Sequence, residues 1–217
     1  MKEPNRERKN DIKYKVQLNE EQKEAKRLIR ENQIVIITGR AGCGKSLVSA
    51  QCALDFLFKK ECDKVFVTRA TIEVGNSMGF LPGALEDKFN PYLEAFMENL
   101  IKCHEKLKVE ELVAEKKILA YPVQFIRGKT VDDLLIVEEA QNLSKAEMLA
   151  ILTRLGKTGK IIINGDNEQT DISTHGINGL SYAIELSKKL EEVKWIKLKE
   201  NHRSDLVGKI LELEYGK

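Results

Sequence analysis

The residues best suited to chemistry begin with a glycine-rich segment, Gly39-x4-Gly44-Lys45-Ser46, which follows the apolar run 34–38. Glycines let successive backbone N–H groups surround phosphate oxygens at the start of a helix. A lysine then reaches the terminal phosphates, and a serine hydroxyl binds Mg²⁺. A chance match is the alternative, which the flanking strand-like and helical patterns disfavour. The predicted nucleotide-binding residues are Gly39, Arg40, Ala41, Gly42, Cys43, Gly44, Lys45, Ser46 and Leu47.

Two further polar segments follow apolar runs and complete the same chemistry. Glu138 and Glu139 end the run 134–137, so we expect Glu138 to join Ser46 at Mg²⁺ and Glu139 to orient or deprotonate the attacking water. Gln169 follows the run 160–164, where its amide could hydrogen-bond the γ-phosphate or the attacking water. The alternatives are a solvated charge pair and an ordinary acidic turn. Together the three motifs predict a catalytic set that includes Lys45, Glu139 and Gln169 and hydrolyses ATP.

Gln22 lies upstream of the glycine-rich segment. Its amide carries donors and an acceptor, so it could read the edge of an adenine ring. An isolated glutamine has no such meaning, and only its position before the phosphate-binding segment favours this role.

Composition excludes several classes of protein. The 217 residues include 36 basic and 34 acidic side chains, so the net charge of +2 indicates neither a polyanion-binding field nor its absence. Four cysteines lack the paired spacing of a zinc site, which favours free thiols in a reducing cytoplasm. We expect a cytoplasmic protein without a membrane segment, because the chain lacks an apolar stretch near ~18 residues and its N-terminus is hydrophilic.

Alternating helical and strand-like patterns must position these residues. They predict one α/β domain over 18–217, after a flexible basic arm over 1–17, with a mainly parallel sheet covered by helices on both faces. Asn19 with Gln22, and Ser144 with Glu147, form capping boxes that start two of the helices. The segment 75–92 is rich in glycine and proline and is predicted to be an ordered surface loop. Strands are predicted at 34–38, 64–70, 118–121, 134–137, 160–164 and 193–198, and helices at 19–32, 45–60, 91–117, 144–155, 179–190 and 205–213.

In its motifs the chain resembles the PhoH family of P-loop ATPases, whose core is similar to the first motor domain of superfamily 1 helicases. The resemblance is carried by 39–46, TRATIEVGNSMGFLPGALEDKFNPY (68–92), IRGKT (126–130), EEAQN (138–142), LTRLG (152–156) and GDNEQTD (165–171). It spans about residues 20 to 215 and implies a RecA-like three-layer P-loop NTPase fold with ATP and Mg²⁺ as ligands. One departure stands out, since the family usually has Asp-Glu where this chain has Glu138-Glu139. The longer carboxylate puts Mg²⁺ affinity or turnover in question.

Helicases of that superfamily receive a catalytic arginine from a second motor domain. The length of this chain allows for only one such domain. We therefore expect the arginine to come from a neighbouring subunit in a head-to-tail homo-oligomeric ring. Arg127 and Arg154 are the leading candidates, followed by Arg203, and a surface ion-pair role is the alternative for each.

Single-stranded RNA or DNA is the expected further partner. Thr68 and Arg69 end a strand where helicase-like folds contact a phosphate backbone. Phe80 and Tyr92 could stack on bases, although anchoring a loop is the more common role of such aromatic residues. The leading hypothesis is a Mg²⁺-dependent ATPase coupled to nucleic acid, with helicase-like activity as an extension. An ATP-driven assembly switch without nucleic acid, or a small-molecule kinase, are the alternatives.

Overall fold

A six-stranded sheet in the order β3-β2-β4-β5-β1-β6 forms the centre of the molecule. The structure is a computed structural model that describes residues 12–70, 85–126, 128–166 and 177–200. Every strand pair in the sheet is parallel, so the carboxyl ends of all strands lie at one edge. The strands are β1 (Ile34–Thr38), β2 (Val65–Arg69), β3 (Ile118–Ala120), β4 (Leu134–Glu138), β5 (Lys160–Gly165) and β6 (Val193–Lys197).

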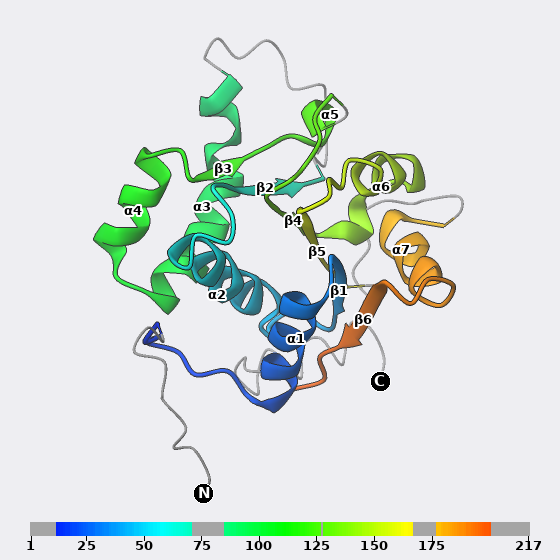
Figure 1. Cartoon of the computed structure of the whole chain (residues 1–217), viewed down its shortest axis with the longest axis horizontal. Coiled ribbons are helices and arrows are strands. Elements are labelled where there is room, and N and C mark those ends of the chain that lie inside the picture. The colour runs from blue at the N-terminus through cyan, green and yellow to red at the C-terminus, as the bar shows by residue number, and fades with distance from the viewer. Residues whose placement is uncertain (1–11, 71–84, 127, 167–176, 201–217) are drawn as a thin grey trace, which may run out of the picture.

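Helices cover both faces of the sheet, so the predicted three-layer α/β fold is confirmed (Figure 1). On one face α1, α2, α3 and α4 pack on strand residues such as Ile37, Val67 and Ile136. On the other face α5, α6 and α7 pack on residues such as Ile36, Leu135 and Ile163. The helices are α1 (Glu20–Glu31), α2 (Lys45–Phe58), α3 (Leu85–Cys103), α4 (Lys106–Ala114), α5 (Val123–Ile126), the 3₁₀ turn η1 (Ala140–Asn142), α6 (Lys145–Leu152) and α7 (Gly179–Ser187).

The predicted strands and both capping boxes are confirmed. The Asn19 side chain accepts a hydrogen bond from the Gln22 backbone N–H while the Gln22 side chain accepts one from the Asn19 N–H. Ser144 and Glu147 make the equivalent pair at the start of α6. These local signals work because each cap satisfies helix N–H groups that have no partner within the helix.

The prediction for the segment before α4 is wrong in two respects. Helix α3 begins at Leu85 and contains Pro91, whereas the prediction had a loop as far as residue 92. The stretch to 117 is also two helices, because α3 ends at Cys103 and α4 begins at Lys106. Tertiary packing of α3 against α2 and β3 outweighs the local cost of the proline. Helices α6 and α7 end three residues earlier than predicted, and the predicted helix 205–213 lies outside the described residues.

Residues 12–17, which the prediction placed in the flexible arm, pack on α2 and α3. The Tyr14 hydroxyl donates to Asp55 Oδ1 at 2.6 Å, and Lys26 pairs with the other oxygen of Asp55 at 2.8 Å. The Lys15 backbone N–H donates to the Cys103 carbonyl at 3.0 Å. The part of the arm that stays a prediction is therefore 1–11, which lies outside the described residues.

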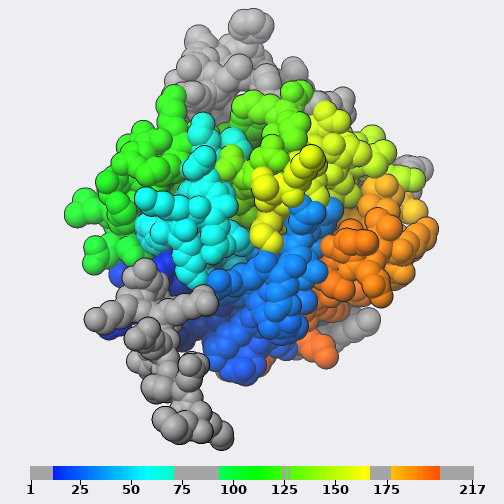
Figure 2. All heavy atoms as spheres, in the orientation of Figure 1, coloured from blue at the N-terminus to red at the C-terminus, as the bar shows by residue number. Residues whose placement is uncertain are grey.

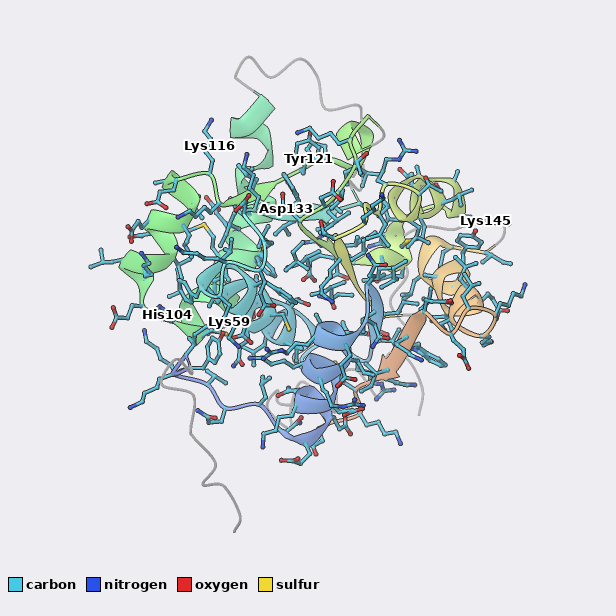
Figure 3. The ribbon with its side chains drawn as sticks, viewed as in Figure 1. Lys59, His104, Lys116, Tyr121, Asp133 and Lys145 are labelled. Carbon is cyan, nitrogen blue, oxygen red and sulfur yellow. The ribbon has the colours of Figure 1, made fainter. Side chains whose placement is uncertain are left out.

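The edge of the sheet opposite the strand carboxyl ends is tied together by loops. Asp133, which precedes β4, accepts backbone N–H groups of Asp63 and Lys64 at 2.9 and 3.1 Å and so aligns β2 with β4. Figure 3 labels Asp133 together with Lys59 at the C-terminal end of α2. In the same orientation, Figure 2 shows blue atoms around α1 beside the cyan atoms of α2 and the orange atoms of α7 and β6. Among the described residues, no helix has the length and hydropathy needed to cross a bilayer.

Candidate nucleotide-binding site

A cavity of about 640 Å³ lies at the carboxyl edge of the sheet, where β1 and β4 end. It brings together the glycine-rich segment after β1 and the two acidic residues at and just after the end of β4. The residues that line it are Val16, Gln17, Gln22, Ala41, Gly42, Gly44, Lys45, Ser46, Leu47, Asn99, Lys102, Glu138 and Glu139. Lys45 and Glu139 therefore face one space, as the proposed chemistry requires.

Two glycines of the loop after β1 stand where a side chain cannot fit. Gly39 has φ +152°, and a Cβ there would lie 2.5 Å from the Leu198 carbonyl oxygen. Gly44 has φ +90°, and a Cβ there would lie 2.3 Å from Gln22 Nε2. Gly44 is also the N-cap of α2, and it brings no side chain to satisfy the first N–H groups of that helix. A helix start with such N–H groups and the positive end of the helix dipole attracts phosphate.

The Lys45 ammonium group folds back on this loop. Its Nζ donates to the carbonyl oxygens of Gly39 and Arg40 at 2.5 and 3.3 Å. Carbonyl oxygens are weaker partners for an ammonium group than phosphate oxygens, because a bond between two charged groups is stronger. Lys45 is thus held within reach of the cavity by contacts that a triphosphate can replace.

The carboxylate of Glu138 is held at both oxygens. The Ser46 hydroxyl donates to Oε2 at 2.8 Å, and Asn164 Nδ2 donates to Oε1 at 2.9 Å. Burial raises the pKa of the Glu138 carboxyl above its ordinary value, and these two hydrogen bonds oppose the rise. A hydroxyl and a carboxylate that meet beside a phosphate-binding loop are oxygen ligands of the kind that Mg²⁺ prefers, so the residues fit that ion.

Glu139 has backbone dihedrals of φ 52° and ψ 46°, in the left-handed region that non-glycine residues seldom adopt. Gln141 bridges it to the next strand, because its Nε2 donates to Glu139 Oε2 at 2.7 Å and its Oε1 accepts from the Asp166 backbone N–H at 3.0 Å. Sparsely populated backbone conformations cluster at functional sites, where they can help to aim a side chain. The turn after β4 thus directs Glu139 into the cavity while Gln141 holds its orientation.

Gln22 is buried beside the loop and connects it to α1. Its Oε1 accepts from the Asn19 N–H at 3.1 Å, and its Nε2 donates to the Cys43 carbonyl at 3.0 Å. Both amide atoms are therefore engaged within the protein. Each amide atom keeps one further hydrogen-bonding position, and the predicted contact with adenine stays a prediction.

The family model for PhoH-like proteins matches residues 15–214. The chain belongs to the PhoH-like family. It is 35% identical over 187 residues to a PhoH-like protein of Synechocystis and 36% identical over 194 residues to one of Bacillus subtilis. It covers 57% and 61% of those two relatives, which are therefore longer than this chain, and the matched regions are 85% and 88% of it.

Solved structures with a similar fold include the large terminase of a thermophilic bacteriophage, with a TM-score of 0.56 and 12% identity. That match covers 93% of this chain and 51% of the terminase. The Pif1 helicase from Candida albicans has a TM-score of 0.52 and 16% identity, with coverage of 92% and 44%. At these identities the likeness concerns the fold alone, which is that of P-loop helicase and terminase domains.

Of the remaining predicted site residues, the described ones, Thr68, Arg69 and Arg154, do not line the cavity. Arg154 follows α6, and its carbonyl accepts from the Val131 N–H at 2.7 Å, near the amino ends of β4 and β5. Arg69 pairs in register with Glu138 at the carboxyl edge, whereas Thr68 is 2% exposed and, by strand alternation, points to the other face. The described residues do not include Arg127, Gln169, Phe80 and Arg203, nor the side chain of Tyr92.

Within the glycine-rich segment, Gly39, Arg40 and Cys43 do not line the cavity, and Cys43 is 2% exposed. Burial raises the pKa of the Cys43 thiol, so the group is a poor nucleophile. Sequence reasoning assigned no role to Gln141 and Asn164, or to the cavity wall formed by Val16, Gln17, Asn99 and Lys102. Only the position of Gln141 two residues after Glu139 offered a signal in the sequence.

Proposed function

We propose that this PhoH-like domain is a Mg²⁺-dependent ATPase. The observation that carries the proposal is the single cavity shared by Lys45, Ser46, Glu138 and Glu139, with Ser46 bonded to Glu138. A P-loop brought together with paired carboxylates at the edge of a parallel sheet is the arrangement that phosphoryl transfer to water requires. Family membership and the fold of helicase and terminase domains support a nucleoside triphosphatase of the PhoH type.

Each residue has a distinct role in this proposal. Backbone N–H groups at the start of α2 and the Lys45 ammonium group bind the β- and γ-phosphates. Ser46 and Glu138 hold Mg²⁺, which when bound neutralises charge on the phosphate oxygens. Glu139 orients a water molecule and accepts its proton, while Gln141 keeps the carboxylate pointed at that water.

A phosphate-release assay with two variants tests the proposal. Lys45→Ala should abolish both nucleotide binding and turnover. Glu139→Gln should leave ATP affinity within about 3-fold of the original and lower kcat by roughly 10²–10⁴-fold, the usual contribution of a general base. A purified protein that neither binds nor hydrolyses ATP at millimolar concentration would disprove the function.

We propose in addition that ATP hydrolysis is coupled to single-stranded RNA or DNA. The support is the helicase and terminase fold and the place of Arg69 at the carboxyl edge, in register with Glu138. RNA or DNA should then stimulate phosphate release, and binding should weaken steeply as salt rises. Rates that stay equal with and without either polymer would favour the assembly switch instead.

We further propose a head-to-tail ring in which Arg154 or Arg127 completes the site of the neighbouring subunit. Arg154 lies at the amino edge of the sheet and the cavity at the carboxyl edge, so a chain's own Arg154 is poorly placed for its own site. Lys45→Ala and Arg154→Ala proteins, each inactive alone, should regain activity when mixed. Full activity of a strictly monomeric protein in a mass measurement would exclude the ring.

A further inference from the structure

Asn164 is the residue before the last of β5, and its side chain is completely buried between β4 and α2. The two hydrogens of its amide are divided between two partners. Nδ2 donates to Glu138 Oε1 at 2.9 Å and to the Ser49 hydroxyl oxygen at 2.8 Å. One side chain thus connects the third motif, the acidic pair and the helix that follows the P-loop.

The orientation of this amide is set by its two donated bonds and not by its oxygen. Asn164 Oδ1 is buried and has no hydrogen-bond partner among the described residues. Rotating the amide by half a turn would place Oδ1, instead of the NH₂ group, against the Glu138 carboxylate oxygen, and two acceptors would then repel. The fold therefore leaves one acceptor unpaired in order to donate to Glu138. Buried polar groups without partners are uncommon and are concentrated at functional sites.

Glutamate needs such a tether more than aspartate would. Its side chain has one more rotatable bond, so an untethered Glu138 carboxylate would spread over several positions at the end of β4. Ser46 restrains the second oxygen, but in the proposed site its hydroxyl also serves as a Mg²⁺ ligand. The bond from Asn164 is then the restraint that does not compete with the metal.

We propose that Asn164 is a positioning residue for the Mg²⁺ site, which holds Glu138 so that a glutamate works where the family pattern has aspartate. This inference rests on the proposed ATPase function. Partners that orient a metal-binding carboxylate in this way typically change metal affinity or activity by about 10–100-fold when they are removed. The effect on Glu138 should therefore appear as weaker Mg²⁺ binding, with nucleotide binding through the P-loop retained.

Asn164→Leu tests the inference, because leucine has the same branched shape and no donor. The affinity for ADP without metal should stay within about 2-fold of the original. The Mg²⁺ concentration needed for half-maximal turnover should rise by roughly 10-fold or more. The affinity of Mn²⁺ for the ADP complex, measured by electron paramagnetic resonance, should fall by roughly 10-fold or more. Ser49→Ala is the matched control, since it removes the other partner of Asn164 and leaves the bond to Glu138. It should keep the original metal dependence.

A double-mutant cycle separates positioning from a general loss of structure. Glu138→Gln weakens Mn²⁺ binding by itself, and adding Asn164→Leu should cause no further loss if Asn164 acts through that carboxylate. Independent, multiplying effects would overturn the inference, as would an unchanged metal dependence in a folded Asn164→Leu protein. If leucine prevents folding, Asn164→Ala, which is smaller and also lacks a donor, is measured in the same way. Failure of the ATPase proposal is distinguishable, because the unaltered protein would then show no metal-dependent turnover at all.

Discussion

Replacement of Gln141 by glutamate changes one atom at the centre of the site. Gln141 is 1% exposed and is held by Glu139 on one side and the Asp166 backbone N–H on the other. Gln141→Glu preserves the length of the side chain, so an oxygen can still accept from Asp166. The NH₂ group that donates to Glu139 Oε2 at 2.7 Å is replaced by a second carboxylate oxygen.

The size of the effect follows from the distance between the two carboxylates. Two unit charges about 4 Å apart repel by about 4 kcal/mol at an effective dielectric constant of about 20. One pKa unit corresponds to about 1.4 kcal/mol, so the pair should take up a proton with a pKa about 3 units above that of an ordinary glutamate. The shared proton occupies the position from which Glu139 would accept one from water. Turnover should therefore require higher pH than in the original protein.

The assay is phosphate release at saturating ATP and Mg²⁺ across the pH range. In Gln141→Glu the acidic limb of kcat should move up by about 3 pH units, which lowers kcat at about pH 6 by roughly 10-fold or more and lets it recover near pH 9. Gln141→Met is the control, because it removes the contact without adding charge and should lower kcat without moving that limb. A Gln141→Glu profile that superimposes on the original would refute the assignment of Glu139 as the base.

Three other predictions concern side-chain hydrogen bonds outside the cavity. Tyr14→Phe removes the bond to Asp55 and should lower the free energy of unfolding by about 1–3 kcal/mol. Burial and Asp55 raise the pKa of Tyr14 above its ordinary value of 10.0. This stabilisation should therefore be complete below about pH 10 and decline above it, so the melting temperatures of the original and Tyr14→Phe proteins should converge at alkaline pH. Lys160 Nζ donates to the carbonyls of Ile29, Arg30 and Asn32 at 2.8–3.1 Å and so caps the end of α1. Lys160→Met removes this cap and should lower the free energy of unfolding by about 1–2 kcal/mol in a denaturant titration. Trp195, the one tryptophan, donates to the Thr38 hydroxyl at 2.8 Å next to the P-loop, so its fluorescence should change on ADP binding and Thr38→Val should remove the change.

Most of the fold was predictable because its signals are local. The strands β1, β4 and β5, which end just before Gly39, at Glu138 and at Gly165, are short and mostly apolar. The capping boxes at Asn19 and Ser144 depend on residues three positions apart. Helix α3 was misjudged because proline and glycine near its start are read as loop signals. Its packing against distant α2 cannot be seen in a sequence window.

The same contrast applies to the site. The P-loop, Glu138 and Glu139 carry their chemistry in consecutive residues, so the motifs indicate them directly. Asn164 is 26 residues from Glu138 and 115 from Ser49, and its role exists only because β5 lies between β4 and β1 in the sheet. The docking of Tyr14 on Asp55 spans 41 residues and is equally invisible locally. Motifs therefore predict which groups react, and tertiary structure decides what holds them.

The polarity of a parallel sheet also bears on the proposed ring. Nucleotide and acids are expected at the carboxyl edge, and Arg154 lies at the amino edge, where Gln33 also binds the carbonyls of Gly156 and Gly159. A six-residue strand such as β5 separates the two edges by about 20 Å. An arginine side chain is far shorter than that, so Arg154 can complete a site only across a contact that joins unlike edges. Such a contact either repeats head-to-tail, closing into a ring or continuing as a filament, or is reciprocal in a two-fold dimer in which each Arg154 enters the other site.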